Sequence, residues 1–243
     1  MSDQSEQQNP FRSRRFVLSI VVVAVIALLG VIVLVSNLFG GKDEAAPTAS
    51  PLPSTTAVPV DSDPSACGLK GYEATASLTN APSTTWTLVG TVAAPSDPEG
   101  SGPGVTDSSG FRSCYAHTAE GALFAAVNFV ALGTDATMQD ELTTLVAPGE
   151  GRDTLMALIA AGTDSGTASV RAQVAGYAIS AYDAQGATVD LALNYSDGQL
   201  VSLPIKLTWS EGDWKVVFAD DGTMPIAPAA LEGLGGYTPW SGA

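Results

Sequence analysis

Side chains that commonly do chemistry are sparse in this sequence, which has one histidine, His117, and two cysteines, Cys67 and Cys114. Cys114 and His117 could act together as nucleophile and general base. A lone histidine just before a helix is, however, more often a capping or surface residue, and a cysteine outside the cytoplasm is better used in a disulfide. We therefore predict no catalytic role for either residue.

A disulfide between Cys67 and Cys114 is the simplest use of the two cysteines. Both follow the membrane segment described below, on the side predicted to lie outside the cytoplasm. Two thiols and one histidine cannot complete a four-ligand zinc site. The bond would close a loop of 47 residues. The chain-entropy model values such a loop at roughly 4 kcal/mol, and the two Cα atoms should lie roughly 4.4–6.8 Å apart.

Two acidic positions suggest further chemistry. Asp190 could act as a base in a pocket, but its alternation with apolar Val189 and Leu191 is more typical of a solvent-facing strand position. The run Asp220-Asp221-Gly222 hints at calcium but lacks acidic residues at further alternate positions, so a turn is the better interpretation. The sequence contains no Gly-x-Ser-x-Gly, phosphate-loop, His-Glu-x-x-His or Cys-x-x-Cys motif. We therefore predict that the protein is not an enzyme and has no catalytic, cofactor-binding or metal-binding residues.

An apolar segment near the N-terminus, Phe16–Phe39, is predicted to span the membrane. Its first part, Phe16–Val35, contains no charged residue, and about 20 helical residues cross the roughly 30 Å hydrocarbon core. A cleaved signal peptide is the alternative. Its apolar region would be shorter and would end at a small-x-small site, whereas this segment ends in Ser36-Asn37-Leu38-Phe39. We therefore expect an uncleaved anchor in contact with membrane lipid.

The residues that flank this segment predict the orientation of the chain. Arg12, Arg14 and Arg15 precede it, so the positive-inside rule places residues 1–15 in the cytoplasm and the C-terminal part outside the cell. The stretch 40–66 is rich in Pro, Ala, Ser and Thr, which predicts a disordered tether. The chain after the membrane segment carries 23 acidic and 7 basic residues, a net charge of −16. Such a charge argues against nucleic-acid binding.

The remainder, residues 67–243, is predicted to form one α+β domain. Residues 86–92 read as a short strand and residues 95–110 as a loop. Three helices are then expected, from Thr118 as N-cap to Gly133, from a capping box at Thr137 to Val146, and from Arg152 to Ala161 with Leu155, Leu158 and Ile159 packing inward. Strands with a period of two follow, over 169–182 with a bulge at Gly176, 187–196, 200–209 and 214–219, with a hairpin turn at Asp197-Gly198. This order predicts an antiparallel sheet that curves around the helices.

The C-terminal pattern resembles a known fold. Three helices and long strands that end in Trp209-x-x-Gly212-Asp213-Trp214-Lys215-Val216 are similar to the cone fold of the nuclear-transport-factor-2-like superfamily, over roughly residues 118–220. With the anchor and the tether, the chain resembles the bitopic scaffold proteins of Gram-positive conjugation channels, although those commonly carry two cone domains and this chain has room for one. The chain also resembles an uncharacterised family of single-pass membrane proteins from high-GC Gram-positive bacteria, in Gly110-Phe111-Arg112-Ser113-Cys114, residues 121–126 and Gly235-Gly236-Tyr237-x-Pro239-Trp240.

These resemblances imply a non-enzymatic scaffold or interaction component in the cell membrane. The implied setting is a conjugative transfer or secretion complex, and the implied partners are other membrane-complex proteins. The alternative is an extracytoplasmic domain that binds or senses a small ligand in the mouth of the cone. Tyr237 and Trp240 could dock on a partner, but packing on their own domain is the preferred interpretation. The sequence does not determine an oligomeric state.

The interior of the cone distinguishes the two functions. A scaffold needs only a rigid surface, so its interior can be filled by side chains. A ligand-binding domain needs an open pocket of some 300 Å³ or more, with Asp190 or a tyrosine hydroxyl pointing into it. The residues expected to surround this space are Leu123, Val127, Leu191, Leu193, Ile205 and Trp214.

Overall fold

The computed structural model describes residues 63–76, 78–162 and 171–242. The predicted cytoplasmic head, the membrane segment Phe16–Phe39 and most of the predicted tether lie outside the described residues. Within the described part, no single helix is long and apolar enough to cross a bilayer. Two helical segments, Ala119–Gly133 and Ala136–Leu145, are together long and apolar enough for a membrane span, but the chain bends by 108° between them.

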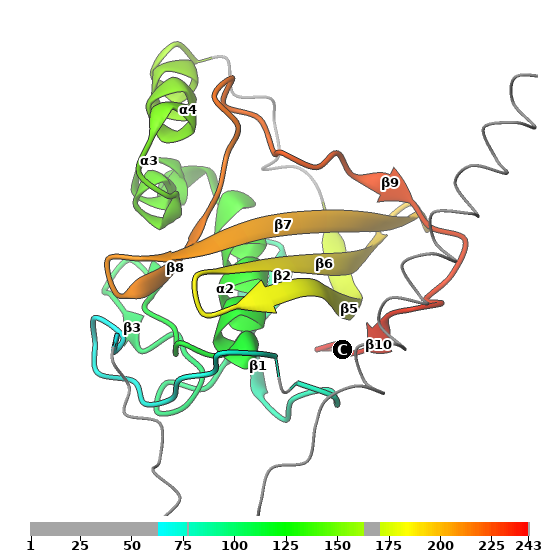
Figure 1. The fold of residues 1–243 in the computed structure, drawn as a ribbon. Helices are drawn as coiled ribbons and strands as arrows, with labels where there is room; N and C mark the ends of the chain where they lie inside the picture. The colour runs from blue at the N-terminus through cyan, green and yellow to red at the C-terminus, as the bar shows by residue number, and fades with distance from the viewer. Residues whose placement is uncertain (1–62, 77, 163–170, 243) are drawn as a thin grey trace, which may run out of the picture. The chain divides into compact units, whose positions relative to one another are not determined.

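The described elements confirm the predicted α+β class, with three helices and a curved antiparallel sheet (Figure 1). In chain order they are β1 (Thr85–Val89), β2 (Val92–Ser96), β3 (Val105–Thr106), β4 (Arg112–Ser113), α2 (Ala119–Gly133), the 3-10 turn η2 (Ala136–Met138), α3 (Gln139–Leu142), the 3-10 turn η3 (Thr143–Leu145), α4 (Glu150–Ala160), β5 (Ala172–Asp183), β6 (Gly186–Tyr195), β7 (Leu200–Ser210), β8 (Asp213–Val216), β9 (Ala229–Ala230) and β10 (Thr238–Pro239). Contacts of the domain already begin before Cys67, because Ser65 is buried and the Ala66 N–H donates to the carbonyl oxygen of Gly212.

Helix α2 is the centre of the core. It begins as predicted at Thr118, whose hydroxyl accepts a hydrogen bond from the Gly121 N–H at 3.0 Å. Twelve of its fifteen residues are buried, because it packs against the β1–β2 hairpin as well as against the large sheet. Its one fully buried amide, Asn128, donates to the carbonyl oxygens of Pro95 and Phe124 and accepts from Arg112. A buried polar side chain is therefore satisfied inside the helix interface.

The large sheet has the order β10-β5-β6-β7-β8, and β9 pairs with β7. Figure 1 shows β5, β6 and β7 side by side, with α2 behind them. The register of β5 on β6 shifts between Val174 and Gly176, which places a bulge where the sequence predicts one. Gly176 is also needed because a Cβ there would lie 2.9 Å from the Thr238 carbonyl oxygen of β10. Because β9 pairs with β7 and β10 pairs with β5, the C-terminal tail runs from β7 to the β5 edge of the sheet.

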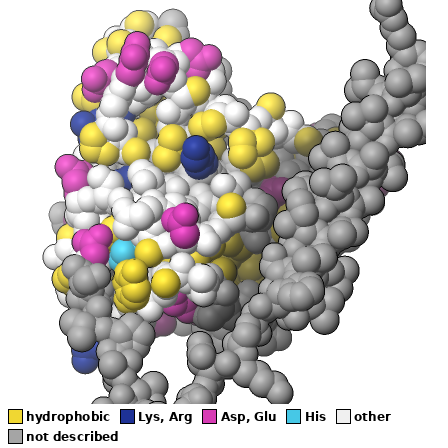
Figure 2. Space-filling view, in the orientation of Figure 1, with side chains coloured by type: hydrophobic (Ala, Val, Ile, Leu, Met, Phe, Trp, Pro, Cys, Tyr) yellow, Lys and Arg dark blue, Asp and Glu magenta, His cyan; other side chains and the backbone are white. Residues whose placement is uncertain are grey.

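Several local predictions are wrong. The strand predicted over 214–219 ends at Val216, and the predicted loop 95–110 contains β3. Residues 86–92 form part of a hairpin, β1 and β2, because Gly90 takes a left-handed φ of +54° and turns the chain. The second helical segment is capped by Asp135, whose carboxylate accepts from the Thr137 N–H at 2.9 Å, instead of by a capping box at Thr137. Leu158 of α4 does not pack inward, since it is 39% exposed. Helix α4 projects from the body of the domain (Figure 1). Acidic and hydrophobic side chains gather on this helix (Figure 2).

Candidate functional site

The predicted disulfide between Cys67 and Cys114 is present, with the two Cα atoms 6.2 Å apart. Cys114 has a φ of 66°, a left-handed conformation that residues with a Cβ seldom adopt. This conformation is held by neighbours, because the Cys114 N–H donates to the carboxylate of Asp213 at 2.9 Å. The bond joins the first described segment of the domain to the chain just before α2, so it holds these two segments together.

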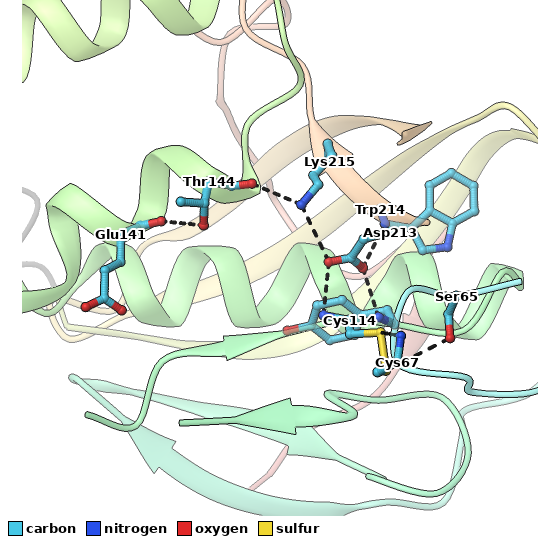
Figure 3. Close-up of polar contacts among 9 residues, drawn as sticks. Ser65, Cys67, Cys114, Glu141, Thr144, Asp213, Trp214 and Lys215 are labelled. Atoms are coloured by element: carbon cyan, nitrogen blue, oxygen red, sulfur yellow. Dashed lines mark hydrogen bonds and ion pairs between the residues drawn. A yellow bond between two sulfur atoms is a disulfide. The ribbon is translucent and has the colours of Figure 1, made fainter. Parts of the chain in front are cut away.

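Asp213 organises the residues around the disulfide (Figure 3). Its carboxylate accepts hydrogen bonds at 2.9 Å from the backbone N–H groups of Cys114, Tyr115 and Trp214, and the Lys215 ammonium lies 3.8 Å away. Burial raises the pKa of Asp213, whereas Lys215 and the three N–H groups act in the opposite direction. A carboxylate with so many internal partners is used as a structural tie and offers little to a ligand.

The other residues of the same motif also connect separate parts of the chain. The Trp214 indole donates to the Ala116 carbonyl oxygen at 3.0 Å, and Lys215 donates to the Thr144 carbonyl oxygen at 3.0 Å. Gly212 has a φ of +75°, and a Cβ there would lie 2.9 Å from the Ala66 nitrogen. The Gly212–Lys215 segment therefore holds the N-terminal segment, the chain just before α2 and the turn η3 to strand β8.

His117 is a core residue, so the expectation of a capping or surface role is wrong. Its side chain has no exposed surface, and its ring stacks on Trp209 with the centroids 3.8 Å apart. Each ring nitrogen lies within hydrogen-bond distance of a backbone carbonyl oxygen, those of Asp63 and Ala184. Because Cys114 is in the disulfide and both nitrogens face carbonyl groups, the two residues do not form a nucleophile–base pair in this structure.

Asp190 lies on the face of β6 opposite to the core. It alternates with Val189 and Leu191, which are fully buried. Its carboxylate accepts from the Ser202 hydroxyl at 2.8 Å and from the Tyr237 hydroxyl at 2.8 Å. Asp190 therefore holds the C-terminal tail and does not point into the interior of the domain.

Trp240, at the end of the tail, packs on its own domain. Its ring lies 4.5 Å from that of Trp86 and 5.8 Å from that of Phe124, measured between centroids, and its indole N–H donates to the Pro82 carbonyl oxygen.

The run Asp220-Asp221-Gly222 forms a turn. The Asp221 carboxylate accepts hydrogen bonds from the Thr223 N–H and hydroxyl and so closes this turn. Within the described residues, no group of three or more His, Cys, Asp or Glu side chains is placed to hold a metal ion.

The six residues expected to surround the interior do not all face the same space. All six side chains are buried, with at most 1% of their surface exposed. Leu193 and Ile205 also line a cavity of about 510 Å³, whereas Leu123, Val127, Leu191 and Trp214 are not among its lining residues. We refer to this cavity as the α4 pocket, since helix α4 forms one of its walls. Representative lining residues are Phe129, Leu142, Leu155, Leu193, Ile205 and Phe218.

The α4 pocket is apolar and uncharged. None of the described residues that line it is Asp, Glu, Lys, Arg or His, and Tyr195 is the one tyrosine among them. The pocket therefore offers an acid–base mechanism neither a carboxylate nor an imidazole. Its few polar neighbours are already engaged in part, since the Thr134 hydroxyl donates to Ala131 and accepts from the Thr91 N–H.

A second hollow, of about 380 Å³, lies at the N-terminus of α2 and is polar. Glu73 and Glu120 line it, and the Glu73 carboxylate accepts from the Ala119 N–H at 2.9 Å. Burial raises the pKa of Glu120, and the nearby charges of Asp97 and Glu73 raise it further, while Ser101 lowers it. Glu73 is thus committed to the start of the helix.

Comparison with known proteins assigns the chain to a family. Residues 45–239 match the family described as a domain of unknown function (DUF8175). The protein belongs to this family. No curated protein and no solved structure matches the chain. The DUF8175 match includes the disulfide, the β8 motif, the α4 pocket and the tail up to Pro239, so these features all lie within the family domain.

Sequence reasoning named two lining residues of the α4 pocket, Leu193 and Ile205, but missed its position beside α4 in the DUF8175 domain. Its walls come from positions as distant as Val92 and Pro228, and their proximity is not visible in any local pattern. One signal was present in the chain: Phe218, Met224 and Pro228 are apolar residues in the loop that follows the last long strand. Apolar residues in a loop need a surface to pack against, and here they complete the pocket wall.

Proposed function

We propose that this DUF8175 protein is a non-enzymatic interaction component of a membrane-spanning transfer or secretion complex. In this proposal, Phe16–Phe39 anchors the chain, the tether holds the domain outside the cytoplasm, and the domain is a nuclear-transport-factor-2-like cone that binds another membrane-complex protein. Tethering raises the effective concentration of the domain toward partners in the same bilayer.

The α4 pocket is the observation that supports this proposal. It is a concave apolar surface without charged lining residues, and large apolar side chains stand exposed on the segments that contribute lining residues. Met156 and Leu158 of α4 are 48% and 39% exposed, and Ile226, between the lining residues Met224 and Pro228, is 40% exposed. Exposed apolar side chains next to a groove are typical of a protein-binding surface. The rest of the domain supplies the rigid base that such a surface needs.

Binding of a small apolar ligand is the second candidate. Its support is the volume of about 510 Å³, which falls within the usual range of ligand pockets. Tyr195 and Gln139 among the lining residues also fit a ligand site. Against it stands Asp190, the other polar group expected in such a site, which lies on the other face of the sheet and is bonded to Tyr237. The two candidates differ in what occupies the pocket in cells.

Photo-crosslinking in intact cells tests the proposal. A photoreactive amino acid at Met156 should capture a membrane-complex protein reproducibly. The same group at Val105, which is 42% exposed on β3 and not on α4, serves as the control and should capture none. Capture of lipid or small molecules alone at Met156 would favour the second candidate, and capture of no protein in repeated trials would refute an interaction role at α4.

A further inference from the structure

We propose that the α4 pocket receives the apolar face of a cationic amphipathic segment of a partner protein. This inference rests on the proposed interaction role and specifies the chemistry of the partner. It combines an apolar, uncharged pocket with exposed carboxylates on the segments that form its walls.

The pocket determines the apolar half of the partner. A groove lined by Leu142, Leu155 and Ile159 on its helical side suits side chains that repeat every three or four residues along a helix. Gly133 keeps part of this space open. A Cβ at Gly133 would meet only the Leu142 Cδ2 atom, at 3.7 Å, so a larger side chain there has room to extend into the pocket.

The charged half of the partner follows from the segments that form the pocket walls. We define the rim carboxylates as the exposed acidic residues of α3, the start of α4 and the loop after β8. They are Asp140, Glu141, Glu150, Asp153, Asp220 and Asp221. Against six carboxylates, the same walls carry Arg152 on α4 and Arg171 just before β5. Acidic side chains over α4, with hydrophobic ones between them, are visible in Figure 2.

This combination favours a cationic protein segment over the other apolar occupants. A neutral ligand would gain nothing from the rim carboxylates, and an anionic lipid surface would be repelled by them. A segment with Lys or Arg beside its apolar face would gain from both features. Charge complementarity of this kind raises the association rate and selects among partners.

A designed peptide can test this chemistry with the full-length protein in nanodiscs of zwitterionic lipid. The probe is a fluorescent amphipathic helix with leucines on one face and lysines on the other. One comparison peptide replaces every lysine with glutamate, and another disperses the leucines around the helix. We expect anisotropy to show binding of the leucine–lysine peptide alone, after subtraction of empty nanodiscs. Its affinity should fall with added salt because exposed charges are screened.

Variants then assign the binding to the pocket and to the rim. Gly133→Leu should fill the pocket and weaken binding about tenfold or more, whereas Gly235→Leu, at an open position of the tail, should not. The pair Glu141→Gln and Asp220→Asn should weaken binding about fivefold. The pair Glu99→Gln and Glu211→Gln changes the net charge equally on exposed residues outside the rim, and it should change affinity less than twofold.

Several results would overturn the inference. They are equal binding of the leucine–glutamate peptide, binding that survives Gly133→Leu, equal effects of the two charge pairs, or no binding of the leucine–lysine peptide. If Met156 still captures a membrane-complex protein in cells in those cases, the interaction role stands and only the partner chemistry is wrong. Loss of both signals rejects the proposed function as well.

Discussion

The two ends of the DUF8175 domain are held together by different kinds of contact. At the β8 end, buried polar groups and a disulfide connect four segments of the chain, around Cys67, Cys114, Thr144 and Asp213. At the other end, only Gly151 of helix α4 is buried, and the helix is tied to the loop after β8 by a hydrogen bond from Thr154 to the Asp220 carbonyl oxygen. Fewer buried groups hold helix α4, so local opening there should cost less free energy than at the tied end.

The largest expected effect is at the tied end. Asp213→Ala would leave three backbone N–H groups and the Lys215 ammonium without their carboxylate partner. Loss of one member of a buried charged network costs about 3–5 kcal/mol. Urea unfolding should show this loss, whereas Glu211→Ala, two positions earlier and exposed, should change the free energy of unfolding by less than about 0.5 kcal/mol. A cost for Asp213→Ala below that of an ordinary surface change would show that Asp213 is not a tie.

The disulfide should have the next largest effect. Replacing Cys67 and Cys114 together by serine should lower the free energy of unfolding by about 2–4 kcal/mol, because the unfolded chain then loses its 47-residue cross-link. Thiol labelling of the denatured, unreduced protein should find no free cysteine. Two labelled thiols per chain would contradict the bond and, with it, the prediction of an oxidising location.

Two glycine substitutions, one at the pocket wall and one in the β6–β7 turn, compare a glycine that can be replaced with one that cannot. Gly133 closes α2 without a positive φ, so Gly133→Ala should raise the free energy of unfolding by about 0.5–1 kcal/mol through helix propensity. Gly198 has a φ of +85° and no atom within 4 Å of its Cβ position, so Gly198→Ala tests the backbone alone and should destabilise by about 1 kcal/mol. Thermal unfolding of both variants measures the difference. Destabilisation by Gly133→Ala would mean that the pocket wall cannot accept a side chain.

The smallest effect concerns Glu120 at the N-terminus of α2. Because burial and neighbouring carboxylates raise its pKa in the folded state, the folded protein holds this proton more tightly than the unfolded chain does. Its contribution to stability is therefore present below the unfolded pKa of about 4.3 and is lost as the pH rises through the folded pKa. Glu120→Gln should raise the melting temperature at pH 7 and leave it unchanged near pH 4. Glu99→Gln is the exposed control, and an equal gain from it at pH 7 would refute the local cause.

Much of the fold could be predicted from local patterns. The hydroxyl of Thr118 begins α2, Gly176 lies at a bulge, and Asp197-Gly198 turns β6 into β7. Each of these features depends on residues a few positions apart, and an even number of cysteines left one intramolecular pairing. Patterns failed where several segments compete for one residue. His117 became a core residue because the two tryptophans of the β7–β8 hairpin, Trp209 and Trp214, surround it.

The sequence by itself therefore determined the α+β class, the element order and the cysteine pairing, because periodicity, caps and turn residues act over short distances along the chain. The tertiary structure alone decided that the Gly212–Lys215 motif ties separate segments, that Asp190 serves the tail, and that an apolar pocket opens beside α4. A pocket is the volume left between elements that meet in space. Its size depends on how Val92, Leu155, Leu193 and Phe218 approach one another, and no local pattern records such distances.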